Sequence, residues 1–277
     1  MDWNKSNTIL IIAFVVLNII LLVSYFGNTN SKEYDVMSDS QFMESVEGML
    51  KQKNIEITGS IPRETYTLPL LETEYEIITA DNQLVQNYLG AGVEAVDEVY
   101  EYYNNLGEKL EITDGKKLIY TAREQLSGKA PDEESMIRFI NDFVAGKNID
   151  VEGYSENRRF VSDEMFILSY TQKYKDYSMD NSYMYFYADS KGIFKFEMQR
   201  INSVKEIPEK VRTVTAVEAL VRLLTYDDVK DKKISEIEMT YYSTEDENWQ
   251  YITRINSDPT WKVIFTDGSQ KHLTSVD

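Results

Sequence analysis

The longest apolar stretch of the chain lies near its start, at residues 8–26, where nineteen residues carry no charge. A helix rises about 1.5 Å per residue, so this stretch would extend about 28 Å, close to the thickness of a bilayer's hydrocarbon core. The pattern predicts one transmembrane helix. A cleaved signal peptide is the alternative, but Asp2 stands beside Lys5 in a weakly basic start and no small-x-small cleavage pattern precedes Gly27. We therefore expect an uncleaved anchor.

The charges around this stretch predict which side of the membrane holds the rest of the chain. Lys5 and the terminal amine precede it, whereas Lys32 follows it together with Glu33 and Asp35. This weak positive-inside bias favours a cytoplasmic N-terminus at residues 1–7, a linker at residues 27–37 and an extracytoplasmic body. The chain has no cysteine, which suits an exported body and would also suit a cytosolic one. The expected location is the cell membrane, crossed once.

Helix-spaced apolar residues begin again just after the linker. Ser38 and Gln41 form a capping pattern before an amphipathic helix that is expected to end near Lys53. Asp81 is expected to cap a shorter helix that stops at Gly90. Short strands are expected between and after these helices, at residues 55–57, 65–68, 74–78 and from residue 96.

The segment after residue 108 carries the clearest turn signal. Asp114 and Gly115 stand between two arms of alternating apolar residues, which predicts a β-hairpin. A helix is expected to open at Pro131, followed by three acids, and to stop at Gly146.

The second half of the chain has the same mixture of elements. Thr215 and Glu218 form a capping box before another helix. Strands are expected at residues 164–174, on both sides of a turn at 189–192, and at 234–242, 250–255 and 261–266. These patterns indicate an α+β fold with two small domains of antiparallel sheet and packed helices. A polar stretch beginning at Asp150 predicts their boundary, which gives domains at residues 38–150 and 151–277.

The net charge of the chain restricts the classes of binding partner that we expect. Forty-seven acids against 29 bases give a formal net charge of −18. Such a body repels phosphate backbones, so we expect no nucleic-acid binding. An anionic lipid surface would repel it too, so the expected membrane contact is the single span.

Several residues near the N-terminus carry a resemblance to a known family. Trp3, Asn4 and Lys5 before the span, the Leu17-Asn18 pair within it, and a late WKVIFTDG in an acidic body of this length resemble the YycI family of membrane-anchored regulators. The resemblance implies a protein without enzymatic activity or cofactor. It implies work with a YycH-like protein on the WalK-type sensor histidine kinase of the WalK/WalR two-component system, which controls cell-wall metabolism in Gram-positive bacteria. Contact through the membrane spans is the implied mechanism.

Asn18 lies near the middle of the predicted span and marks its candidate partner-binding face. An interhelical hydrogen bond in a membrane contributes about 0.6 kcal/mol on average, enough to bias orientation but not to hold a complex alone. An opportunistic local bond for this amide is the plain alternative. Three- and four-residue spacing places further side chains on the same face: Ile11, Phe14, Val15, Leu21, Leu22 and Tyr25. Trp3, Lys5 and Tyr25 are expected at the membrane interfaces.

The body offers fewer candidate sites. Tyr183, Tyr185 and Tyr187 have period-two spacing and should share one sheet face, as a binding platform or as ordinary cross-strand packing. His272 is the only histidine, and no cysteine exists to form a metal site with it, so no catalytic or metal role is expected. Acid-rich runs that begin at Asp132 and at residue 243 lack the spacing of a calcium loop and read as helix starts and turns.

Two other functions stay open at this point. An exported binding module for a wall fragment or peptide would need an exposed aromatic groove. An exported hydrolase would need a cleft with two converging carboxylates, which composition alone cannot exclude.

Overall fold

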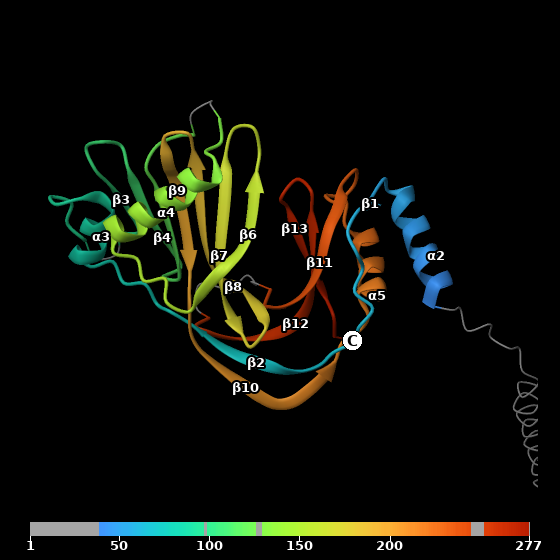
Figure 1. Ribbon diagram of the computed structural model, residues 1–277. Helices are drawn as coiled ribbons and strands as arrows, with labels where there is room; N and C mark the ends of the chain where they lie inside the picture. The colour runs from blue at the N-terminus through green and yellow to red at the C-terminus, as the bar shows by residue number, and fades with distance from the viewer. Residues whose placement is uncertain (1–38, 97–98, 126–128, 245–251, 277) are drawn as a thin grey trace, which may run out of the picture. The chain divides into compact units, whose positions relative to one another are not determined.

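The computed structural model describes residues 39–96, 99–125, 129–244 and 252–276 (Figure 1). The predicted anchor, its flanks and the linker lie outside these residues. Within the described ranges, no helix is long and apolar enough to cross a membrane. Helix α2 (Asp39–Gln52) follows the predicted capping pattern, and the contacts from Val46 to Asp277 form one compact unit, which is described below.

Two helices begin where the sequence places their caps, whereas a third begins at Glu133 with Asp132 as its cap and not at the predicted Pro131. Asp81 Oδ1 accepts a hydrogen bond from the Leu84 amide at 2.7 Å, and Thr215 and Glu218 form both bonds of a capping box. The end of one helix was predicted wrongly: Asn148, in the left-handed conformation, caps it, and Gly146 lies inside it. The remaining helices are α3 (Asn82–Leu89), α4 (Glu133–Lys147) and α5 (Ala216–Val221), which continues as the 3-10 turn η1 (Arg222–Thr225).

Strands make up most of the described chain, which confirms the α+β class with a larger share of sheet than helix. Their hydrogen bonds follow the order β10-β2-β12-β11-β8-β9-β5-β4-β3, with β1 beside β11, β13 beside β12, β7 beside β8, and β6 beside β7. The pairs β1–β11 and β8–β11 are parallel, which the sequence did not suggest. The strands are β1 (Glu56–Ile57), β2 (Thr67–Tyr75), β3 (Glu101–Tyr103), β4 (Lys109–Thr113), β5 (Lys117–Thr121), β6 (Tyr154–Val161), β7 (Phe166–Tyr174), β8 (Tyr177–Asp189), β9 (Gly192–Gln199), β10 (Ile201–Arg212), β11 (Lys233–Tyr242), β12 (Arg254–Phe265) and β13 (Gln270–Thr274).

Two strands continue through prolines at places where the sequence analysis expected pairs of shorter strands. Pro69 lies within β2, where the pairing with β10 is irregular between Glu206 and Lys210. Pro259 lies within β12, which bends from β2 to β11 around this position. Proline cannot donate a ladder hydrogen bond, so it is tolerated in a strand at such irregular places. The sequence therefore predicted two pairs of short strands where two long ones form.

The long strand β8 connects two parts of the sheet. Near its start, Ser178 and Met179 pair with β11 on one side while Tyr177 and Ser178 pair with the end of β7 on the other. From Tyr183 onward, β8 pairs with β7 and β9. Asp180 to Ser182 therefore form a joint between the two parts. Strands also pair across the boundary predicted near Asp150, because β2 pairs with β10 and β12, and β5 pairs with β9. The two-domain division stays a prediction.

Helices α3 and α4 cover one face of β3, β4, β5, β9 and β8 (Figure 1). Met136 and Ile140 of α4 and Val85 of α3 pack on buried strand residues such as Phe186 and Phe196. A separate cluster, with Leu71, Tyr75, Met179, Ile201 and Tyr241, fills the other part of the sheet. In the part of the sheet formed by β3, β4, β5, β9 and β8, the face opposite α3 and α4 carries polar and aromatic side chains. The candidate sites lie on this face.

Candidate functional site

One row of side chains crosses the sheet face opposite α3 and α4. Residues that pair directly across neighbouring strands lie on the same face. The register joins the following residues in sequence across seven strands: Glu101, Glu111, Ile119, Glu197, Tyr185, Ser169 and Arg158. We call this face the open sheet face. It therefore runs from an acidic end at β3 to a basic end at β6.

The predicted tyrosine group lies at the centre of the open sheet face. The ring centroids of Tyr183 and Tyr185 are 5.0 Å apart, and those of Tyr185 and Tyr187 are 6.3 Å apart, which confirms that the three rings share one face. All three are half-buried. Burial raises the pKa of Tyr185, and the charge of Asp180 adds to this effect. The rings thus form a semi-exposed aromatic strip.

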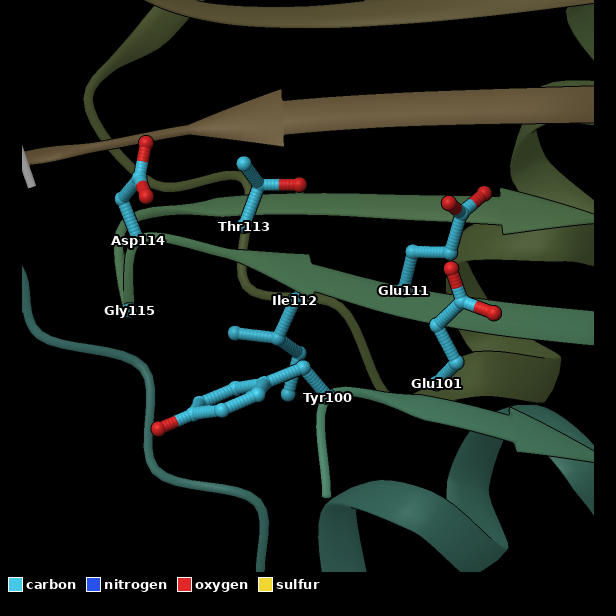
Figure 2. Close-up of a pocket in the computed structure, with 7 residues that line it drawn as sticks. All are labelled: Tyr100, Glu101, Glu111, Ile112, Thr113, Asp114 and Gly115. Atoms are coloured by element: carbon cyan, nitrogen blue, oxygen red, sulfur yellow. The ribbon is translucent and has the colours of Figure 1, made fainter. Parts of the chain in front are cut away.

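The acidic end of the face holds a pocket of about 580 Å³ beside β3 (Figure 2). Strand β3 ends the strand order, so one of its edges has no strand partner within the described part of the chain. Apolar side chains are exposed around it, with Tyr100 and Tyr103 each more than half exposed. Figure 2 shows the residues that line the pocket: Tyr100, Glu101, Glu111, Ile112, Thr113, Asp114 and Gly115.

The glutamates of this pocket are tied into ion pairs. Lys109 Nζ lies 2.9 Å from Glu111 and 3.4 Å from Glu101, and the hydrogen bond that the lysine donates to Glu111 raises the pKa of the lysine. An exposed carboxylate, Glu101, and a half-buried one, Glu111, that share one lysine at the sheet edge form an ion-pair cluster at the surface. This arrangement differs from that of a glycosidase, whose two catalytic carboxyl groups flank the glycosidic bond to be cleaved. The exposed apolar rings and the unpaired strand edge are features of protein-contact surfaces.

A group of charged side chains that the sequence analysis did not predict lies at the sheet joint. One carboxylate oxygen of Asp180 on β8 accepts a hydrogen bond from Lys262 Nζ at 3.0 Å. The other oxygen lies 2.6 Å from His272 Nε2. Lys262 is fully buried and also lies 2.5 Å from Glu238. The His272 ring stacks on Tyr242 with centroids 3.8 Å apart. We call Asp180, Lys262 and His272 the joint triad.

The joint triad is electrostatically stable. Burial alone would raise the pKa of Asp180, but Lys262 and His272 outweigh it and lower the pKa. Burial alone would lower the pKa of Lys262, but Asp180 and Glu238 outweigh it and raise the pKa. Each charge is therefore kept by its partner. Within the described residues, β8 has no backbone pairing with β12 or β13. The side chains of the triad therefore provide a direct link between β8 and these two strands.

The predicted span-face residues lie outside the described residues: Ile11, Phe14, Val15, Asn18, Leu21, Leu22 and Tyr25, as do Trp3 and Lys5. The acidic run at Asp132 is the start of α4, with Asp132 as its cap, whereas residues 245–251 of the second run are not described. No group of three possible metal ligands occurs within the described ranges. Asp180 and Lys262 were missed, although a lysine inside the apolar run WKVIF is a signal for a buried partner.

Comparison with protein families decides the relationship of the chain. The profile of the family described as YycI protein matches residues 34–276. The chain belongs to the YycI family. The resemblance was based mostly on residues near the N-terminus, whereas the profile matches residues that lie almost entirely in the body. The family match therefore confirms the resemblance from a largely different part of the chain. A search of curated proteins gives no match.

Solved structures show which fold this YycI chain resembles. The crystal structure of YycH from Bacillus subtilis matches 77% of this chain and 53% of its own length, with a TM-score of 0.54 and 13% identity. The chain thus spans about half the length of that YycH. An uncharacterized protein from Eubacterium rectale (TM-score 0.43, 9% identity, 83% of this chain and 94% of its own) and the YpeB C-terminal domain of Bacillus megaterium (0.31, 8%, 86% and 98%) are more distant. The fold is therefore similar to that of YycH.

Proposed function

We propose that this YycI-family protein is a non-enzymatic, membrane-anchored regulator. In this proposal it binds a WalK-type sensor histidine kinase together with a YycH-like protein and alters signalling to cell-wall metabolism. The observation that carries the proposal is the family match over residues 34–276. The likeness of its fold to YycH supports it, since regulatory proteins of one pathway then share one architecture.

The proposed contacts lie in two places. The face of the span that contains Asn18 contacts the kinase within the membrane, and the body contacts the YycH-like protein through the exposed edge of β3. An exposed strand edge with apolar side chains offers both backbone hydrogen bonds and buried area to a partner. Holding the body near the membrane raises the effective concentration of weak contacts to about the millimolar range.

Co-purification from detergent tests the span contact. The full-length chain is compared with a chain whose residues 8–26 are replaced by an unrelated apolar helix, and with Asn18→Leu. We expect the kinase to be lost with the replaced span and reduced with Asn18→Leu. Val16→Leu, an apolar change away from the Asn18 face, should retain it. Equal recovery of the kinase by all four proteins at equal expression would refute the span contact.

A second pair of variants tests the body contact. Tyr100→Asp introduces a charge at the β3 pocket, whereas Val161→Asp introduces the same charge at another exposed apolar position, on β6. We expect only Tyr100→Asp to reduce recovery of the YycH-like protein. Equal recovery with both variants would remove the β3 edge from the proposal.

A further inference from the structure

A second cavity, of about 300 Å³, lies at the basic end of the open sheet face. It lies between β6, β7 and β8 on one side and the turn between β12 and β13 on the other, and it is partly open to solvent. Its size is at the small end of the range for ligand sites. The side chains that matter for its chemistry are Arg158, Phe160, Ser169, Tyr185, Tyr187 and Gln270.

Arg158 provides a positive charge that the described chain satisfies only in part. Its Nη1 donates to Gln270 Oε1 at 3.4 Å, whereas its buried Nη2 has no hydrogen-bond partner within the described residues. A guanidinium carries five donors, and leaving them unpaired in a buried place is unfavourable. Burial lowers the pKa of Arg158, and the carboxylates of Glu238, Glu236 and Asp180 oppose this effect only through longer-range attraction.

Ser169 is the cross-strand neighbour of Arg158 and lines the same cavity. Its side chain is only 1% exposed, and its hydroxyl has no hydrogen-bond partner within the described residues. The register between β6 and β7 shifts between Glu156 and Arg158, so an irregular residue immediately precedes the arginine. Such bulges redirect side chains and are common beside binding sites.

The other walls are apolar or aromatic. Phe160 and Tyr187 line the cavity beside Ile167. The β12–β13 turn comes so close that a Cβ on Gly268 would lie 2.6 Å from the Phe160 ring. The carboxylate of Asp267 on this turn lies 3.1 Å from Lys232, which offsets its charge.

We propose that this cavity binds a small molecule with one carboxylate beside an apolar or aromatic side group, the chemistry of an N-acylated amino acid. The carboxylate of the ligand accepts hydrogen bonds from Arg158 Nη2 and from the Ser169 hydroxyl, and its side group packs against Phe160 and Tyr187. A guanidinium matches a carboxylate in shape and charge. The chain's net charge of −18 disfavours ligands with several negative charges. This site is separate from the proposed partner contacts, and its test uses no partner protein.

Ligand-observed NMR titration of the full-length chain tests the proposal. The probes are N-acetylphenylalanine and N-acetylleucine, each compared with its C-terminal amide, which has the same side group without the carboxylate. We expect the acids to bind with a Kd of about 1 mM or tighter and the amides to bind about tenfold or more weakly, the size of effect of one charge-assisted hydrogen bond.

Two variants of neighbouring arginines locate the effect. Arg158→Met should abolish the preference for the acids, whereas Arg159→Met should keep it, because Arg159 is exposed and pairs with Glu156 and Glu133. Equal binding of acids and amides, no binding of either acid up to about 10 mM, or unchanged binding by Arg158→Met would each overturn the proposal. The comparison of acid with amide on the unaltered chain decides the matter even if Arg158→Met fails to fold.

Discussion

Replacing Lys262 by methionine is the most direct test of the joint triad. The lysine side chain is fully buried, and methionine keeps most of its apolar length while removing the ammonium. Asp180, 3% exposed, would then keep only His272 as a partner, and Glu238, 34% exposed, would be left to water. The substitution therefore removes the lysine partner of the buried Asp180 carboxylate, whereas Glu238 can be solvated by water in place of its lost partner.

The magnitude follows from that difference. Breaking a buried ion pair by removing one partner costs about 3–5 kcal/mol, whereas exposed pairs contribute about 0–1 kcal/mol. We expect Lys262→Met to lower the free energy of unfolding by about 3–5 kcal/mol, nearly all of it through Asp180. The double variant Lys262→Met/Asp180→Asn should be more stable than the sum of the single effects by about 1 kcal/mol or more, because Asp180 no longer leaves a buried carboxylate without its lysine.

Urea unfolding of the full-length chain in a mild detergent measures these values, with the fluorescence of the buried Trp261 included in the signal. Lys233→Met is the matched control, because Lys233 pairs with Glu56 at 2.8 Å while both side chains are more than half exposed. A loss below about 1 kcal/mol for Lys262→Met, or additive effects in the double variant, would refute the structural role of the triad.

Two further predictions concern packing and pH. Gly59→Ala should cost about 1–3 kcal/mol of stability, because its Cβ would lie 2.1 Å from the Ser235 carbonyl oxygen, whereas Gly48→Ala, with no atom within 4 Å, should not destabilise; equal unfolding midpoints in urea would contradict this. Because the pKa of Asp180 is lowered in the folded state, its stabilisation exists above the unfolded pKa of about 3.9 and is lost as pH falls through the folded pKa. Asp180→Asn should therefore lose less stability between pH 6 and about pH 3 than the unaltered chain, and an equal or larger loss would show that other groups control acid unfolding.

The features found from the sequence are those that a few neighbouring residues determine. Asp81 and Thr215 cap their helices as expected, and Asp114 and Gly115 both adopt the positive φ that a tight hairpin turn requires. Each depends on contacts within about one turn of chain. The helix end at Asn148 was missed because either asparagine or glycine can adopt the left-handed conformation, and the pattern alone favoured Gly146.

The order of the strands could not be found in this way. β8 pairs with β11 in parallel and with β9 in antiparallel orientation, and no local pattern shows where one pairing ends and the other begins. The joint triad depends on that change, since Asp180 meets His272 only because the chain returns after 92 residues. The apolar pattern predicted strands at both places but not their meeting. The candidate span face was reasoned from periodicity alone and stays a prediction.

Two cationic side chains of this acidic chain, Lys262 and Arg158, have environments that indicate different roles, one structural and one in ligand binding. Lys262 is fully buried and has two carboxylates within 3.0 Å, so the protein itself completes its charge pairing. Arg158 is more accessible and lines a cavity; within the described residues it donates to the Gln270 amide oxygen at 3.4 Å, and its Nη2 has no hydrogen-bond partner. A cation needed only for stability would be expected to have the first environment, since buried charges are tolerated when they are paired. The second environment leaves a carboxylate to be supplied from outside the described chain, and this is the reason for placing the ligand site at Arg158 and the structural role at Lys262.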